Sequence, residues 1–287
     1  MIIKVVIVLN ATDFEYDGIH ARDFGLIICN IDSGGGVETT PVGAEINFNM
    51  VSSQHGSIQY ITDTTYDSVL EATFHVCKFS CETDLEYLTI EEQREITRWL
   101  NRDEVHLLRF ISDDPTYDHV CYEGTFNINK IEVNGQVIGL ELHFISNRPF
   151  ALGNKKYFII NATTADYEYE FKDDSDKIGY IYPDVLAVTL DSSVESNSTL
   201  TIHNSAENRT TRVKNCTGGE TITFTGCSNI SSDLNIEGYT AHKVQNDFNY
   251  MYFRVANSYS NRMNKITISV PCVMKFEYYP IVKGVGL

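Results

Sequence analysis

The sequence is short of proline, tryptophan and positive charge, and it has no long uninterrupted apolar run. Its 287 residues include six prolines and one tryptophan, against 17 tyrosines and 15 phenylalanines. Few prolines and many aromatic side chains favour β structure. No stretch approaches the roughly 18 to 20 apolar residues that a transmembrane helix needs, so we expect no membrane insertion. Hydrophobic residues make up 43% of the chain, which is normal for a folded protein and argues against disorder.

The apolar start of the chain lacks the features of a signal peptide. The run over residues 1–9 is short, Lys4 interrupts it, and no small-residue cleavage site precedes the acidic stretch from Asp13 to Asp17. A signal peptide needs a longer apolar region and such a site. We therefore expect residues 1–9 to form a buried first strand.

Paired cysteine motifs are missing. The seven cysteines are odd in number and scattered, and no Cys-x-x-Cys occurs. In a chain of this length that pattern predicts reduced, mostly buried thiols in a protein made in the cytoplasm.

Basic residues are few, and the deficit lies in one half of the chain. The net charge is −17, from 39 acidic and 22 basic side chains. Residues 1–150 hold 24 acidic and 9 basic side chains, a net of −15, whereas residues 151–287 have a net of −2. This contrast predicts a domain boundary near Arg148–Phe150. It also argues against binding of nucleic acid or an anionic membrane by the first half.

Motifs for catalysis and metal binding are absent as well. No His-x-x-x-His pair occurs, and the nearest candidate metal pair, Cys77 and Cys81, has no second pair to complete it. The acidic run 173–176 lacks the glycine and the distal glutamate of a calcium loop, so we expect a solvated turn. We therefore expect no enzyme activity, no cofactor and no metal site.

One amphipathic helix is strongly encoded over residues 90–101. Thr89 is a good N-cap, and Glu92 three residues later completes a capping box. Ile96, Trp99 and Leu100 fall at helical spacing and form one apolar stripe. We expect Trp99 to anchor this helix in the core and to bind no ligand.

Alternating apolar residues predict strands elsewhere in the first half. Two such sets predict half-buried strands with one face in the core: Ile46, Phe48 and Met50, and Leu70, Ala72, Phe74 and Val76. The polar stretch Ser52–Asp63 between them is long enough to contact a neighbouring subunit. Asn134-Gly135 predicts a hairpin turn of type I′.

The second half predicts an all-β sandwich, because short strand-like runs recur between breaker residues. The predicted strands are Ile178–Tyr182, Val185–Leu190, Thr199–His203, Thr221–Phe224, Tyr252–Val255, Ile266–Val270 and Val273–Tyr279.

The order of several short segments resembles the distal tail (Dit) proteins of siphophages, over nearly the whole chain. The segments of the first half are Asp23-Phe24-Gly25-Leu26, the helix residues Ile96, Trp99 and Leu100, the turn residues Asp113, Asp114, Pro115 and Tyr117, and the domain exit Arg148-Pro149-Phe150. In the second half they are Ile181–Pro183, Leu200–Asn204, Gly219–Phe224 and Phe276–Pro280. Adjacent aspartates before a proline are better suited to form a turn than a catalytic pair.

The resemblance implies a mostly β protein with two domains. Residues 1–150 would be an α+β domain that forms a hexameric ring, and residues 151–287 a galectin-like β-sandwich. The ring would join the tail tube to the tail-associated fibre or lysin protein, and the second domain would project outward toward receptor-binding or baseplate proteins. DNA would pass through the central channel without specific binding. Such a protein is assembled in the host cytoplasm and resides at the tail tip of the virion.

Two further expectations stay open at this point. The acid excess of the first half predicts an acidic channel lining that repels DNA, although the carboxylates would equally well keep the ring's outside soluble. The second half is alternatively a carbohydrate-binding module, whose stacking residues would come from Tyr167, Tyr169, Tyr180, Tyr182, Tyr250, Tyr252, Tyr278 and Tyr279. Alternating tyrosines in strands more often pack against neighbours, so we favour the hub.

Overall fold

The computed structural model describes residues 11–29, 46–52, 59–66, 69–78, 87–112, 120–234, 243–258 and 260–283. The chain is mostly β, as its composition predicts. The strand predicted over residues 1–9 and the turn residues Asp113, Asp114, Pro115 and Tyr117 lie outside the described residues. Two compact units divide the chain. The first holds Met1–Gly153 with Val282–Leu287, and the second holds Asn154–Ile281.

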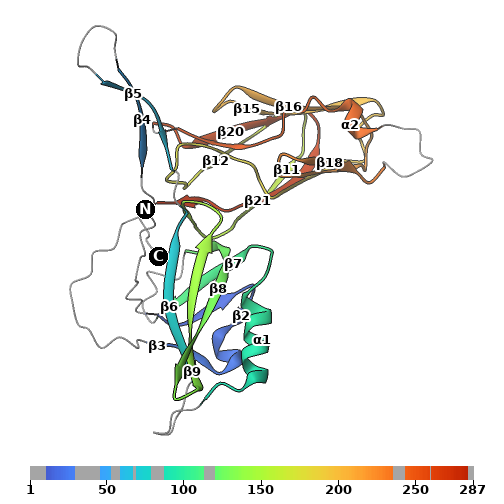
Figure 1. Ribbon diagram of the computed structural model, residues 1–287. Coiled ribbons are helices and arrows are strands. Elements are labelled where there is room, and N and C mark those ends of the chain that lie inside the picture. Colours follow the sequence, from blue (N-terminus) through green and yellow to red (C-terminus); the bar gives the residue numbers. More distant parts are fainter. Residues whose placement is uncertain are drawn as a thin grey trace. The chain divides into compact units, whose positions relative to one another are not determined.

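A seven-stranded antiparallel sheet forms the first unit (Figure 1). Its strand order is β2-β1-β7-β8-β9-β6-β3. The strands are β1 (Ala11–Tyr16), β2 (Ile19–His20), β3 (Leu26–Cys29), β6 (Glu71–Lys78), β7 (His106–Ser112), β8 (Tyr122–Val133) and β9 (Gln136–Ser146). A short 3-10 helix, η1 (Ala21–Phe24), joins β2 to β3, and β10 (Ala151–Leu152) pairs with β22 (Ile281–Val282).

One face of this sheet is apolar because its strands alternate. In β6, Ala72, Phe74 and Val76 are buried, whereas the residues between them are half-buried. The strand predicted there is therefore confirmed. β8 and β9 meet at Asn134 and Gly135, whose φ angles of 52° and 79° are both positive. A type I′ turn requires that backbone, and the asparagine-glycine pair predicted it.

Helix α1 (Ile90–Leu100) packs on the apolar face of the sheet beside β8 (Figure 1). The capping box is present: the Thr89 hydroxyl accepts a hydrogen bond from the Glu92 backbone N–H at 3.2 Å, and the Glu92 carboxylate accepts one from the Thr89 backbone N–H at 2.8 Å. Lys78 also pairs with Glu92 at 2.8 Å and is the main cause of the lowered pKa of that carboxyl. Because the pKa is lowered in the folded state, this stabilisation is present at neutral pH and is lost as the pH falls through that pKa.

Replacing Thr89 by alanine should lower the free energy of unfolding of the first unit by about 1 kcal/mol, because the Glu92 backbone N–H loses its acceptor. Thr89→Ser keeps the hydroxyl and is the matched control. A urea titration followed by the fluorescence of Trp99, the sole tryptophan, reports on this unit alone. An alanine variant as stable as the serine variant would mean that the cap contributes nothing.

The hairpin of β4 (Asn47–Ser52) and β5 (Gln59–Thr65) forms a sheet of its own. Within the described residues, these two strands pair only with each other. Figure 1 draws them as a separate two-stranded ribbon.

The second unit is a sandwich of two antiparallel sheets (Figure 1). The five-stranded sheet has the order β11-β21-β14-β17-β18 and the four-stranded sheet β12-β20-β15-β16. Their strands are β11 (Lys156–Ala162), β12 (Tyr167–Lys172), β14 (Val185–Leu190), β15 (Ser198–Asn204), β16 (Arg209–Cys216), β17 (Thr221–Thr225), β18 (Asn229–Ser232), β20 (Met263–Ile268) and β21 (Cys272–Tyr278). β13 (Gly179–Ile181) pairs with β19 (Val255–Asn257), and a single helical turn, α2 (Val244–Asp247), follows residue 243. The inward residues of both sheets build one apolar core.

Other expectations about the chain have mixed outcomes. The six described cysteines are free thiols. Neither helix in the described part of the chain has the length and hydrophobicity that a membrane crossing requires. In the acidic run 173–176, Asp174 and Asp176 are exposed, as a solvated turn predicts, but Asp173 is not. Asp173 and Ser175 are each 1% exposed, and the Asp173 carboxylate accepts hydrogen bonds from the Ser175 and Tyr278 hydroxyls at 2.9 and 3.1 Å. The burial of the β21 end explains this difference.

Candidate functional site

Trp99 is the centre of the first unit's core. Its indole is 4% exposed and stacks between Phe24, with ring centroids 4.6 Å apart, and Phe14, 5.6 Å away. The indole N–H donates to the Tyr16 backbone carbonyl at 3.0 Å. Ile96 and Leu100 are buried on the same side of α1. Both the indole ring of Trp99 and its N–H group therefore make their contacts inside the first unit.

The segment Asp23–Leu26 meets the helix at Trp99. Asp23 accepts a hydrogen bond from the His20 backbone N–H at 3.2 Å and so caps η1. Gly25 ends η1 with a φ of 68°, in the left-handed region that glycine adopts without strain. Leu26 is fully buried. Two sequence segments about 70 residues apart thus build one packing cluster, and their role is to shape the fold.

The residues at the predicted domain exit also make internal contacts. Arg148 pairs with Glu123 and Asn147. Phe150 is 6% exposed and packs edge-on against Tyr66, with centroids 4.7 Å apart. Pro149 between them is half-buried. These family-like residues are not gathered at any exposed surface.

Among the described residues, the largest set of exposed apolar side chains lies instead on the β4–β5 hairpin. The register of the two strands shifts between Asn49 and Met50, so that Thr62 has no partner residue on β4. Phe48 therefore lies opposite Thr64, and Met50 lies opposite Ile61. One face of the hairpin consequently carries Ile46, Phe48, Met50 and Ile61, which are 43–59% exposed. We call these four side chains the hairpin face. The opposite face has polar Asn49 and Asp63, with Val51 and Tyr60 nearer the tip.

The hairpin face corrects the prediction that Ile46, Phe48 and Met50 point into the core. The alternation correctly predicts a strand, but no described strand of the large sheet pairs with β4 or β5. An isolated two-stranded hairpin is at best marginally stable in water, and contiguous exposed apolar residues mark a surface that another protein covers. The hairpin is thus the candidate assembly site.

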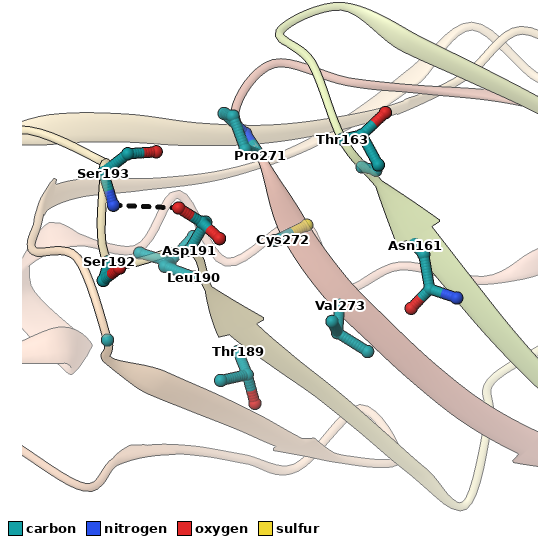
Figure 2. Close-up of a pocket in the computed structure, with 12 residues that line it drawn as sticks. Asn161, Thr163, Thr189, Leu190, Asp191, Ser192, Ser193, Pro271, Cys272 and Val273 are labelled. Carbon is teal, nitrogen blue, oxygen red and sulfur yellow. Dashed lines mark hydrogen bonds between the residues drawn. The ribbon is translucent and has the colours of Figure 1, made fainter.

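A shallow hollow of about 520 Å³ opens in the second unit, at the ends of β11, β14 and β21 (Figure 2). Its lining combines the apolar Ala162, Leu190, Pro271 and Val273 with polar side chains, which are Asn161, Thr163, Thr189, Asp191, Ser192 and Ser193. Asp191 is its one carboxylate and accepts the Ser193 backbone N–H at 2.9 Å; the Ser193 hydrogen bonds lower the pKa of Asp191. Burial raises the pKa of the Cys272 thiol to about 12, so this lining residue is a protonated thiol and a poor nucleophile at neutral pH.

The described residues contain no cluster of three or more metal-ligating side chains. Cys81 of the candidate pair Cys77 and Cys81 lies outside them. Cys77 neighbours Cys29, whose pKa is raised to about 12 by burial and by the Cys77 thiol.

Two family models match the chain. Residues 9–148 match a phage tail protein N-terminal domain, and residues 150–278 match a phage tail C-terminal domain. No curated protein matches in sequence. Among solved structures, the chain is similar to SPP1 Dit (gp 19.1), described as a paradigm of the hub adsorption apparatus in phages that infect Gram-positive bacteria. The similarity has a TM-score of 0.60 at 13% sequence identity and covers 93% of this chain and 98% of that one. At this identity it shows a shared fold. With both of its domains matched, this chain belongs to the phage tail proteins and has the fold of a distal tail (Dit) protein.

Proposed function

We propose that this protein is the distal tail hub of a siphophage, a structural and non-enzymatic component of the virion. Six copies of residues 1–150 form a ring that joins the tail tube to the tail-associated fibre or lysin protein. Residues 151–287 project outward, toward receptor-binding or baseplate proteins. The family and the fold support the tail role, and the hairpin face is the observation that carries the assembly.

The hairpin face favours a ring over a dimer. A two-fold dimer buries the same patch on both copies, whereas a head-to-tail contact buries two different patches and closes into a ring when the rotation fits. A hairpin that stands apart from the sheet and is apolar on one face reaches a neighbour's different surface more readily than its own counterpart. In such a ring, each copy covers the hairpin of one neighbour and places its own hairpin on the other neighbour. No hairpin face is then left exposed.

The purified protein, alone or with its tail tube partner, should therefore form a ring of six. Native mass spectrometry gives the mass of the assembly, and negative-stain images show whether it is hollow. A chain that stays monomeric at every protein concentration and with tail proteins present would contradict the hub.

The excess of acidic residues in the first half would have a function in such a ring. Duplex DNA carries one negative charge per ~1.7 Å, so an acidic channel repels it and lets it slide, whereas a basic one would bind it. At physiological salt this repulsion reaches ~8 Å from the wall, so only carboxylates that face the channel contribute. The exposed acidic residues of the described part of this half include Glu91, Glu95, Asp103, Glu104 and Glu132. A structure of the ring at side-chain resolution tests whether the channel lining is acidic. A neutral or basic channel surface would exclude an acidic lining.

A further inference from the structure

One strand at the margin of the second unit's sandwich has a free edge. β11 is the outermost strand of the five-stranded sheet, and it pairs with β21 from Lys156 to Ala162 without a register shift. Figure 2 shows Asn161 on β11, Val273 on β21 and Thr189 on β14, on strands that follow one another in this order. Within the described residues, no strand pairs with the other side of β11. Its outward backbone groups are therefore open to a further strand.

One hydrogen bond beyond the ends of β14 and β21 identifies these outward groups. Asp191 and Pro271 continue the β14–β21 ladder, and the Asp191 backbone N–H donates to the Pro271 carbonyl at 3.0 Å. The odd-numbered residues of β21 therefore face β14, because backbone groups alternate in direction along a strand. The even-numbered residues of β21 bond to the even-numbered residues of β11. The outward N–H and C=O groups of β11 consequently belong to Tyr157, Ile159 and Asn161.

The side chains at these three positions carry no charge. Tyr157 and Ile159 are 58% and 49% exposed, and Asn161 is exposed as well. We call the outward backbone groups and the side chains of these three residues the open edge. Natural proteins protect a sheet edge with charged side chains, proline, a bulge or a covering segment. A regular seven-residue edge without a charge at its outward positions is a surface on which another strand can pair.

The corresponding edge of the other sheet has the protection that β11 lacks. Asp173 continues the ladder of β12, and its backbone N–H donates to the Arg262 carbonyl at 2.9 Å. The odd-numbered residues of β12 therefore face β20, and the even-numbered ones point outward. The outward residues are Glu168, Glu170 and Lys172, whose side chains are all exposed. A strand added to β12 would lie beside three charged side chains, whereas a strand added to β11 meets none at the outward positions.

The two remaining edges of the sandwich are covered by the chain itself. On β16, the Asn249 backbone N–H donates to the Arg212 carbonyl at 3.1 Å, and the Asn249 side-chain amide donates to the Thr210 carbonyl at 2.9 Å. β18 has only four residues, and the Gln245 amide donates to the Ile230 carbonyl at 3.1 Å. In the described part of the chain, β11 is thus the one sandwich edge that is neither covered nor charged.

We propose that the open edge of β11 receives an extended segment of another tail protein as an added strand. The segment hydrogen-bonds to the outward backbone groups and places apolar side chains at alternate positions, beside Tyr157 and Ile159. The inference rests on the proposed function, from which it takes the partner, a tail protein that docks on the second unit. A second copy does not fit, because pairing of β11 with itself requires a two-fold axis, whereas neighbouring copies in a ring of six are related by a six-fold rotation.

Short overlapping peptides that cover the receptor-binding and baseplate proteins of the same phage are the probes. The full chain should bind at least one of them, as measured by the fluorescence anisotropy of the labelled peptide. On binding, the amide protons of Tyr157, Ile159 and Asn161 should become protected against hydrogen exchange. The amide protons of Phe158 and Ile160 bond to β21 and should be protected already in the free chain. This alternating pattern distinguishes an added strand from a contact made by side chains alone.

Ile159→Pro tests the role of the backbone directly. The Ile159 N–H points outward, so proline removes no hydrogen bond to β21, and edge strands tolerate proline at such positions. The variant should weaken peptide binding by at least about tenfold. Ile159→Glu keeps the strand backbone and copies the charged edge of β12, so it should weaken binding even if the proline variant does not fold. Glu170→Pro removes an outward N–H of β12 and should bind the peptide as the parent does.

The proposal is overturned if no peptide binds, if either folded variant of Ile159 binds as the parent does, or if the amides of the open edge stay unprotected on binding. It is also overturned if the parent forms a dimer that Ile159→Glu abolishes, because the occupant would then be a second copy. The open edge is complete within one copy, so a monomeric chain should bind the peptide as well as a ring does. Failure of the ring and failure of this inference are therefore distinguishable.

Discussion

Replacing Trp99 by alanine should lower the free energy of unfolding of the first unit by ~3–5 kcal/mol, as for other large buried aromatic truncations. The substitution removes the ring between Phe24 and Phe14 and leaves the Tyr16 carbonyl without the indole N–H. A protein domain is stabilised by only about 5–15 kcal/mol in total, so the variant should be close to unfolding at ambient temperature.

Calorimetry measures this loss, with the transition of the second unit as an internal reference. Trp99→Phe keeps an aromatic ring but loses the hydrogen bond, so it should fall between the parent and the alanine variant. Ile90 begins the same helix and is 85% exposed, so Ile90→Ala should change the stability by less than about 0.5 kcal/mol. If Trp99→Ala were as stable as Ile90→Ala, the indole would have to lie at a surface.

Replacing Phe48 and Ile61 together by serine should prevent ring assembly while each chain remains folded. Burying one large apolar side chain contributes roughly 1.5–3 kcal/mol. Losing two in each contact weakens that contact by ~3–6 kcal/mol, or about a hundredfold to ten-thousandfold in dissociation constant. Both side chains are more than half exposed in the single chain, so their loss should not lower its own thermal midpoint.

Sedimentation velocity compares this double variant with a matched one. Asn49 and Asp63 lie opposite each other on the other face of the same hairpin, and changing both to serine should leave assembly intact. Equal assembly of the two double variants would show that the hairpin face is not the contact. If both double variants failed to assemble, the hairpin would contribute to assembly through its backbone.

Where short-range chemistry decides a structure, the sequence was sufficient. α1 spans Ile90–Leu100 with its capping box, β14 spans Val185–Leu190, and the turn at Asn134–Gly135 has the backbone that its residues favour. Each depends on groups only a few residues apart: a cap and its third neighbour, an alternating run, and two residues that tolerate positive φ.

Strands whose sequence signal is weak were missed. β16 reads Arg-Thr-Thr-Arg-Val-Lys-Asn-Cys, and of these Thr211, Val213 and Cys216 are buried. β11 is an edge strand that has apolar Tyr157 and Ile159 on its exposed side, so apolar and polar residues do not alternate in its sequence, although buried and exposed positions do. Such strands form because a neighbouring strand supplies hydrogen bonds, and that neighbour is distant in the sequence.

The same limit applies to the hairpin face. The alternation of Ile46, Phe48 and Met50 determines that one face of β4 is apolar. Only the pairing of β4 with β5 alone leaves that face exposed and turns a predicted core strand into a surface for a second chain. Periodicity therefore determined which faces are apolar, and long-range strand pairing decided which of them the chain covers itself.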